Sequence, residues 1–333
     1  MINLAHFREP TYLSPSSFLQ FDGDPLTFYI ERLGPRDLRP AREQQGFAAG
    51  VGTAFDEWIK AGWEGVAPDF AGVECAEPAR AIDLGVQVGL VYVESGAWGM
   101  LQSEGQIVGM ESDLYGVIPG TDVPIRGKLD TNWDGLRAHD FKVRGGNQIR
   151  DRESNISAMT ALLEGASMGE HAAGLLAEEQ KLGVACPGTF AAAANKVKTP
   201  SPNPGYVRHY TRDGLTQGKK GSHKRSGEAM EDLNVKWAIQ LSIYSWLLNG
   251  RIGQCAAAID QLVPQPDGDV RVCQFRTYIS ERFQQTLAAR MVSAWDRIQS
   301  RSVIDTRIPL ELQLLRRDST PFWKKDPKWW RTA

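Results

Sequence analysis

Two short runs joined by a turn signal constrain the fold of this chain most. Gly127-Lys128-Leu129-Asp130 ends one stretch of strand character, and Asp140-Phe141-Lys142 lies in the next, after the pair Asp134-Gly135. An Asp-Gly pair between two such stretches is typical of a β-hairpin. Residues i and i+2 of a strand point to the same face, so Asp140 and Lys142 are predicted to project together. The hairpin would then carry two acids and one lysine on one side of a sheet.

Two carboxylates beside an ammonium group suit a magnesium site. Mg²⁺ prefers oxygen ligands, usually one or two carboxylates with water and a substrate phosphate. Asp130 and Asp140 supply carboxylates, and the backbone carbonyl of Phe141 supplies a further oxygen. Lys142 could position or deprotonate an attacking water, or balance charge at phosphorus. The alternative is a surface hairpin with solvated charges, because charged residues mostly occupy exposed strand faces.

A second feature is the helix predicted over Trp237–Leu248, which Asn249-Gly250 would end as a C-cap. Gln240 and Tyr244 are four residues apart and therefore share a helix face. An amide and a phenol on an otherwise apolar helix could contact a phosphate or orient a catalytic lysine. Alternatively, Tyr244 belongs to the core and only its hydroxyl reaches water.

In chain order, Gly127-x-x-Asp130, Asp140-x-Lys142 and Gln240-x-x-x-Tyr244 resemble the motifs of the PD-(D/E)XK nuclease superfamily, specifically its RecB-like exonuclease branch. The resemblance implies an α/β fold with a restriction-endonuclease-like core, in which helices flank a central mixed β-sheet and a helical insertion follows the catalytic strand. It also implies Mg²⁺- or Mn²⁺-dependent hydrolysis of DNA, most simply by an exonuclease of recombination or repair, as in phage and prophage relatives. The implied partners are DNA and a single-strand annealing protein.

Two N-terminal segments extend the resemblance, which runs from Tyr12 to about Leu248. Tyr12–Tyr29 resembles the opening helix-turn-helix of the branch, and Gly52–Trp58 resembles its next motif, a glycine followed by a histidine on a helix. The family histidine is Asp56 here. An aspartate can bind a hard cation through oxygen, so Asp56 is a candidate accessory ligand. It could equally be an ordinary acid on the helix surface.

Glu111 is a further candidate. It lies in a predicted strand over residues 106–118, which would complete a three-stranded meander with strands over 123–134 and 136–143. In the family core, the strand before the metal-binding aspartate often carries such a glutamate. Glu111 would then bind the metal or support its ligands; otherwise it is a solvated strand acid.

Cysteine content argues against an iron–sulfur cluster. Relatives with a cluster have a cysteine before the proline of the opening motif, where this chain has Asp24. The four cysteines lack clustered ligand spacing: Cys75, Cys186, Cys255 and Cys273. We predict no cluster, and few scattered cysteines suit a reducing cytoplasm rather than a disulfide framework.

Charge gives no overall attraction to DNA, because the formal net charge of the 333 residues is -2. Binding would need local basic patches, as is normal for nucleases with acidic sites. The candidates follow a proline-rich stretch, and all but the first lie within a glycine-rich segment over 214–227: Arg208, Lys219, Lys220, Lys224 and Arg225. Since this stretch lies between the predicted catalytic strand and the Gln240/Tyr244 helix, its ends should return near the site. A solvated basic loop is the alternative.

The chain has the length of one elaborated domain or of two smaller ones. We interpret it as a single nuclease domain: 12–101 N-terminal helices, 104–143 catalytic strands, 145–230 insertion with the basic loop, 231–250 the Gln/Tyr helix, and 251–333 C-terminal strands, a helix and an aromatic-basic tail. The tail could stack on bases, although packing on the domain is favoured. No segment is apolar over a membrane-spanning length, and we expect a cytoplasmic protein without a membrane partner.

The sequence leaves two other functions open. A non-cleaving DNA-binding module on a decayed nuclease fold would explain Asp56 in place of histidine, but the retained Asp130, Asp140 and Lys142 argue against decay. An endonuclease of the same superfamily would use the same acids and lysine. Only an endonuclease could cut circular DNA.

Overall fold

The computed structural model describes residues 6–36, 39, 44–133, 137–143, 206–211, 214–215, 229–264, 270–304, 313 and 329–332, with the backbone alone at 206–211 and 214–215. The helix predicted within 154–196 lies outside the described residues. So do four of the basic candidates: Lys219, Lys220, Lys224 and Arg225.

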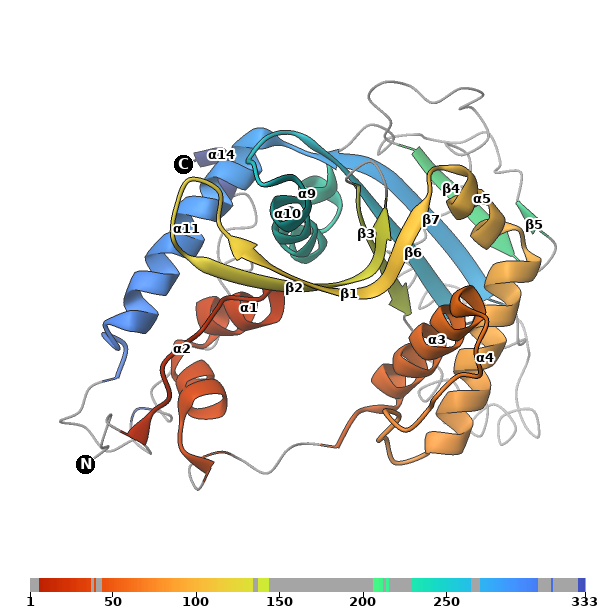
Figure 1. Cartoon of the computed structure of the whole chain (residues 1–333), viewed down its shortest axis with the longest axis horizontal. Helices are drawn as coiled ribbons and strands as arrows, with labels where there is room; N and C mark the ends of the chain where they lie inside the picture. Colours follow the sequence, from red (N-terminus) through yellow and green to blue (C-terminus); the bar gives the residue numbers. More distant parts are fainter. Residues whose placement is uncertain are drawn as a thin grey trace, which may run out of the picture.

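A mixed β-sheet organises the described part of the chain (Figure 1). Its strand order is β1-β2-β3-β6-β7-β4-β5. The strands are β1 (Ile107–Val117), β2 (Pro124–Trp133), β3 (Ala138–Val143), β4 (Tyr206–Thr211), β5 (Gly214–Leu215), β6 (Cys255–Pro264) and β7 (Val270–Ile279). Neighbouring strands are antiparallel except β3 and β6, which are parallel. A parallel pair needs a long connection, and the segment between β3 and β6 includes helix α10.

Helices cover both faces of this sheet, which makes the fold α/β. They are α1 (Pro15–Gly23), α2 (Pro25–Phe28), the π-helical turn η2 (Tyr29–Leu33), α3 (Phe47–Glu64), α4 (Pro78–Glu94), α5 (Ala97–Ser103), α9 (Met230–Leu233), α10 (Val235–Asn249), α11 (Glu281–Gln299) and α14 (Trp329–Thr332). Helix α10 packs on β1, β2, β3 and β6, and the curved β1–β2 ribbon passes beneath it in Figure 1. Helices α3 and α4 pack together at the opposite face, against β3, β6 and β7.

Capping residues explain where the helices near the candidate site begin and end. Ser14 and Asp24 precede prolines, and their side chains accept hydrogen bonds from the first turns of α1 and α2. Asn234 caps α10 in the same way. Gly250 ends α10 in the left-handed conformation, at a φ of 64°, as the Asn-Gly signal predicts.

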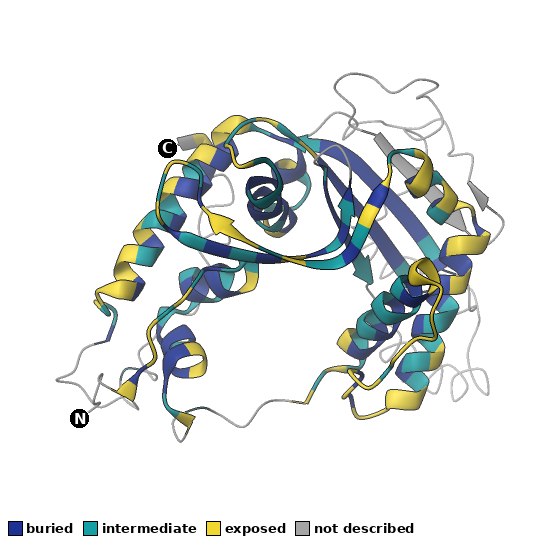
Figure 2. Cartoon of the chain, in the orientation of Figure 1, coloured by how far each residue is buried: buried dark blue, intermediate teal, exposed yellow. Residues whose placement is uncertain are grey.

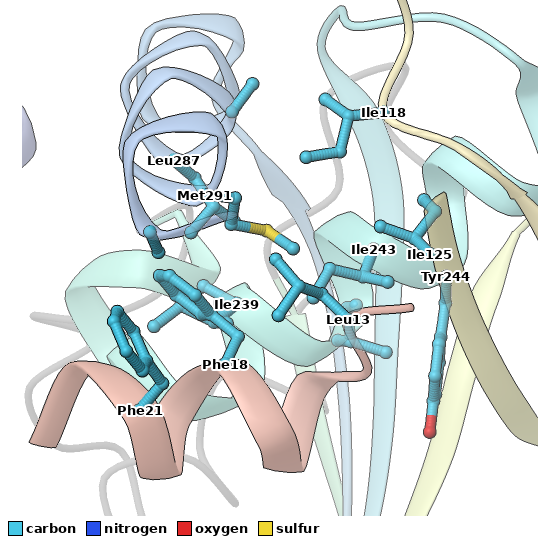
Figure 3. Packing of buried hydrophobic residues seen from close by; sticks show 14 of the residues in the cluster. Leu13, Phe18, Phe21, Ile118, Ile125, Ile239, Ile243, Tyr244, Leu287 and Met291 are labelled. Carbon is cyan, nitrogen blue, oxygen red and sulfur yellow. The ribbon is translucent and has the colours of Figure 1, made fainter. Parts of the chain in front are cut away.

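The core divides between the two faces of the sheet. The larger part joins α1, α10 and α11 to the sheet, and Figure 3 shows its apolar side chains meeting around Met291 and Leu13. A second part lies under α3 and α4 and includes Phe55, Tyr92 and Phe141. Figure 2 shows buried residues concentrated in α10 and the central strands, with exposed residues at the outer helix faces. The catalytic strand of our prediction, β3, thus lies between two apolar layers.

Most predicted elements match within a few residues, and three expectations are corrected or narrowed. The helical spacing of the apolar residues over 78–101 predicts one helix, but the structure has two, because Gly96 adopts a φ of 83° between α4 and α5. Residues 206–211 form a strand rather than a loop. In the aromatic-basic tail, Trp329 and Trp330 pack in the core, on Phe283, as the favoured alternative predicted.

Two further observations bear on the cysteines and on membranes. Cys75 and Cys255 are free thiols, whereas Cys273 is disulfide-bonded. Of the helices that the structure describes, none combines the length and the apolar character needed to cross a bilayer.

Candidate active site

Strand β3 presents opposite sets of side chains to its two helical layers. Asp140 contacts α10, whereas His139 and Phe141 pack with aromatic rings on the other face. β3 pairs along its whole length with β6, and within the described residues it pairs with β2 only at Thr131 and His139. Among these residues the two hairpin strands pair no further, which leaves a gap between β2 and β3.

Asp130 spans this gap. Its Oδ2 accepts a hydrogen bond from the backbone N–H of Phe141 at 2.7 Å. The N–H and C=O of one strand residue point to the same edge, because a paired residue exchanges both bonds with one neighbour. The carbonyl of Phe141 therefore points toward Asp130 as well. A carboxylate and a backbone carbonyl thus lie together, as the sequence predicts.

A side chain of α10 holds Asp140 in place by a hydrogen bond. Asp140 is only 1 % exposed; its Oδ1 accepts from the Nε2 of Gln240 at 2.8 Å, and its Oδ2 forms an ion pair with Lys142. The Nε2 of Gln240 also donates to the hydroxyl of Tyr244 at 2.8 Å. Gln240 therefore links the acid of β3 to the phenol one helical turn away.

Tyr244 lies between the core and the site. Its ring belongs to the apolar cluster, but its hydroxyl points away from the labelled apolar side chains (Figure 3). Burial, and then the negative charge of Asp130, raise the pKa of this hydroxyl well above its usual value, so it stays protonated. Tyr244 is thus both a core residue and a neutral donor at the site, which combines the two interpretations that the sequence left open.

Gly127 permits this arrangement. A Cβ on Gly127 would stand 2.8 Å from Cδ1 of Leu247 and 2.9 Å from two ring carbons of Tyr244. Side chains on both partners would then need to shift. The first residue of the Gly-x-x-Asp motif is therefore glycine because α10 passes directly over β2 at this point.

Asp56 joins the cluster from α3, across the sheet from α10. Its pKa is raised well above the usual value by burial first and then by the negative charges of Asp130 and Glu111. Burial lowers the pKa of the Lys142 ammonium, against the opposing effects of Asp130 and Asp56. We call Asp56, Asp130, Asp140 and Lys142 the acid–lysine cluster. Three acids share one half-buried lysine, so acids outnumber the cation in this cluster.

Glu111 lies next to this cluster with a strained backbone. On β1 it falls between the pairs Met110–Thr131 and Ser112–Leu129, directly opposite Asp130, with a φ of 50°. Like charges opposite one another destabilise a sheet, and left-handed residues other than glycine often mark functional sites. The Oε2 of Glu111 is engaged by Lys128 and by Lys60, the latter at 3.8 Å. Glu111 therefore adds negative potential while two lysines hold its carboxylate.

The donor set fits Mg²⁺ or Mn²⁺. Across the described ranges, no three or more His, Cys, Asp and Glu side chains converge as a complete metal site. Mg²⁺ does not need one, since it retains water and takes one or two carboxylates. Asp130, Asp140 and the Phe141 carbonyl meet that requirement, and a cation would relieve the repulsion that raises the pKa of Asp56. An aspartate at position 56 is compatible with the same ion.

A cleft of about 530 Å³ leads to the cluster. It is lined by the start of α1, by β2 and by the first turns of α10. Its charged lining residues are Arg126, Lys128, Lys142, Lys236 and Asp113. Four lining cations against one lining acid offer groups that can contact a polyanion, although Arg126, Lys128 and Lys142 are each paired with an acid.

A buried ion network lies behind β3 and was missed by the sequence analysis. Asp260 of β6 accepts hydrogen bonds from Arg276, Tyr92 and Gln274 and lies 3.5 Å from the Nε2 of His139. Arg276 also bonds Glu104, which pairs with Arg137 at the surface. We call Glu104, Arg137, Asp260 and Arg276 the buried ion network. The signal was available: Asp260 and Arg276 are charged residues within apolar strand runs.

The network reaches the place where the two acid-bearing strands pair, because His139 lies 3.5 Å from Asp260. His139 Nδ1 and Thr131 Oγ1 are 2.6 Å apart and hydrogen-bonded, at the one pair that β2 and β3 form within the described residues. Thr131 follows Asp130 and His139 precedes Asp140. The spacing of the two acids therefore depends on this bond.

One basic candidate is not where it was expected. Arg208 lies on β4, opposite Gln274 of β7, and both β6 and β7 separate β4 from β3. A strand paired in a sheet cannot reorder on DNA as a loop would. The expectation that Arg208 belongs to a loop near the site is therefore wrong.

Comparison with known proteins gives no independent identification. No protein-family model, no curated protein and no solved structure matches this chain. The function must be inferred from the geometry of the acid–lysine cluster and its cleft.

Proposed function

We propose that the chain is a metal-dependent deoxyribonuclease built on a restriction-endonuclease-like core. The observation that carries the proposal is the meeting of Asp130, Asp140 and Lys142 at the gap between β2 and β3, beside a cation-lined cleft. These are the groups that phosphodiester hydrolysis requires: oxygen ligands for a hard cation and a nearby proton-exchanging amine. Gln240 and Tyr244 reach the same point from α10.

The side chains divide the work. Asp130, Asp140 and the Phe141 carbonyl would hold Mg²⁺ or Mn²⁺, with Asp56 as an accessory ligand. When bound, the ion supplies charge stabilisation to a phosphate and acidifies water. Lys142, whose pKa burial lowers, can accept a proton from the attacking water more readily than an exposed lysine. The protonated hydroxyl of Tyr244 is a neutral donor that can orient a phosphate oxygen.

An exonuclease fits the cleft and the motif order best. The cleft is lined by cations that can follow a DNA backbone. The resemblance of the motifs to the RecB-like branch favours action at DNA ends in recombination or repair. An end-dependent enzyme should shorten linear DNA and leave circular DNA intact.

The test is degradation of end-labelled linear, circular and single-stranded DNA with Mg²⁺ or with EDTA. We expect Mg²⁺-dependent shortening of linear DNA alone. Lys142→Ala should reduce the rate by about 10²–10⁴-fold, the usual contribution of a positioned proton-transfer group. Arg80→Ala removes an exposed cation of α4, remote from the cleft lining, and should match wild type. Equal rates for wild type and Lys142→Ala would refute the assignment.

A non-cleaving DNA-binding module is the second candidate. Asp140 is almost fully buried, and both its carboxylate oxygens are engaged, by Gln240 and Lys142. If that arrangement persisted with divalent ions present, the fold would bind DNA without cutting it. DNA binding by wild type without cleavage in either Mg²⁺ or Mn²⁺ would favour this candidate.

A further inference from the structure

An exposed aromatic side chain stands at the rim of the cleft. Tyr115 on β1 is 66 % exposed, the most exposed large hydrophobic residue in the described part of the chain. The neighbouring Gly116 points to the opposite face, where an added Cβ would stand 3.2 Å from Leu247 of α10. Tyr115 therefore projects from the face of the β1–β2 ribbon that α10 does not cover.

A cation fixes the position of this ring. The guanidinium carbon of Arg126 lies 5.1 Å from the ring centre of Tyr115 and 5.3 Å from that of Tyr12. The two rings are 6.5 Å apart and nearly perpendicular, at 87°. Arg126 is itself held, by a 2.8 Å hydrogen bond to the hydroxyl of Tyr12 and by an ion pair with Asp113. The three side chains form a preorganised stack rather than a free surface tyrosine.

The surroundings of this stack identify the kind of ligand it suits. A flat ring with most of its surface in water can bind another flat, weakly polar group by stacking. The cleft beside it, which Tyr12 and Arg126 both line, carries four cations and one acid. A ligand with flat apolar rings and a row of negative charges meets both conditions. A nucleic acid strand with unpaired bases is such a ligand.

The position along β2 connects the stack to the acid–lysine cluster. Arg126, Lys128 and Asp130 alternate on β2 and so share one face. Four residues of strand separate Arg126 from Asp130 by roughly 13 Å. At about 3.4 Å per stacked phosphate, that is a few nucleotides along one strand. One strand can therefore reach the acids and the stack together.

We propose that Tyr12, Arg126 and Tyr115 form a nucleobase-stacking subsite, which takes an unpaired base a few nucleotides from the phosphate held at the acid–lysine cluster. The inference rests on DNA being the substrate, and it narrows the substrate class. Stacking on Tyr115 requires an exposed base face, which a paired duplex does not present. The preferred substrate is then a single strand or a frayed end.

Binding without cleavage tests this subsite. Affinity for a single strand carrying 2-aminopurine, and for a blunt duplex of the same sequence, is measured by anisotropy in EDTA, together with 2-aminopurine quenching. Tyr115→Ala should weaken single-strand binding by roughly 5- to 150-fold, the range for one stacked base, and should abolish the quenching. Tyr115→Phe keeps the ring and should stay within twofold of wild type.

Val108→Ala is the matched control, because Val108 is also exposed on β1, at 51 %, but lies at the other end of the strand. It should bind as wild type does. Single-strand binding and quenching unchanged in Tyr115→Ala, or no single-strand binding by wild type, would overturn the subsite. Since EDTA prevents metal-dependent cleavage, this result is separate from the nuclease assignment: wild type that stacks a base without cutting in Mg²⁺ would contradict the nuclease alone.

Discussion

Two charged clusters of opposite character lie around strand β3. The acid–lysine cluster gathers Asp56, Asp130 and Asp140 around a single lysine, and the pKa of Asp56 is raised while that of Lys142 is lowered. In the buried ion network, Asp260 and Arg276 are at least as well shielded from water. There, Arg276 holds the pKa of Asp260 well below its usual range despite burial, and Asp260 raises that of Arg276.

The difference separates a structural role from a functional one. In the buried ion network two acids meet two arginines, and the fold stabilises the charges of Asp260 and Arg276. In the acid–lysine cluster the fold destabilises the charges of Asp56 and Lys142. A site that destabilises its own charges is typical of catalysis or ion binding, because a cation or substrate can supply the missing compensation. Replacing an aspartate with asparagine should therefore lower the free energy of unfolding at Asp260 and raise it at Asp56.

The largest expected effect is the loss of an acid from the buried ion network. Asp260→Asn should lower the free energy of unfolding by about 3 kcal/mol, because one partner of a buried ion pair is removed. Urea unfolding at pH 7 measures this. Asp83→Asn changes an exposed acid of α4 and should stay within about 0.5 kcal/mol of wild type.

The pH dependence of this effect has a defined sign. Asp260 has a lowered pKa in the folded state, so its contribution is complete above the unfolded pKa near 4 and is lost as pH falls through the folded value. The gap between wild type and Asp260→Asn should therefore narrow below about pH 4. If the difference in stability between wild type and Asp260→Asn widened on acidification, the conclusion that Arg276 compensates the charge of Asp260 would be contradicted.

A medium effect is expected where α10 crosses β2. Gly127→Ala places a methyl group against Leu247 and Tyr244 and should cost about 1–3 kcal/mol of stability through overpacking. It should also slow DNA cleavage, because Tyr244 must move, although no charge of the acid–lysine cluster is altered. Gly62→Ala in α3 has open space around its added Cβ and should be neutral or stabilising. If Gly127→Ala cleaved DNA at the wild-type rate, Tyr244 would have no role in cleavage.

The smallest effect should have the opposite sign. In EDTA at pH 7, Asp56→Asn should raise the free energy of unfolding, because the folded state disfavours the charged carboxylate. Each pKa unit of that shift corresponds to about 1.4 kcal/mol. The gain should vanish as pH falls below about 4, where Asp56 becomes protonated in the unfolded state as well as in the folded state, and grow as pH rises. If Asp56→Asn lowered the free energy of unfolding in EDTA, this variant would behave like Asp260→Asn, and the contrast between the two clusters would be contradicted.

Local signals explain why part of this organisation was predictable. The alternation of strand residues placed Asp140 and Lys142 on one face, and the four-residue spacing paired Gln240 with Tyr244. Both rules depend only on near neighbours in the chain. The Asn249-Gly250 signal located the end of α10 for the same reason.

The features that the sequence did not predict depend on contacts between segments far apart in the chain. The parallel contact of β3 with β6 and the place of β4 beside β7 join segments far apart in sequence, so the basic stretch around Arg208 could be interpreted only by composition. The buried ion network likewise joins Glu104 to Arg276, which are 172 residues apart in the sequence. In the sequence, Gly96 only interrupts an apolar pattern of helical spacing. In the structure, its left-handed backbone divides α4 from α5.

The most direct test of the central claim is calorimetric titration of wild type with Mn²⁺ in the absence of DNA. The excess of acid over cation in the acid–lysine cluster predicts binding of a divalent ion, weakened at least tenfold by Asp130→Asn and unchanged by Asp83→Asn. Absence of Mn²⁺ binding by wild type, or equal affinity in Asp130→Asn, would contradict the assignment of these acids as metal ligands.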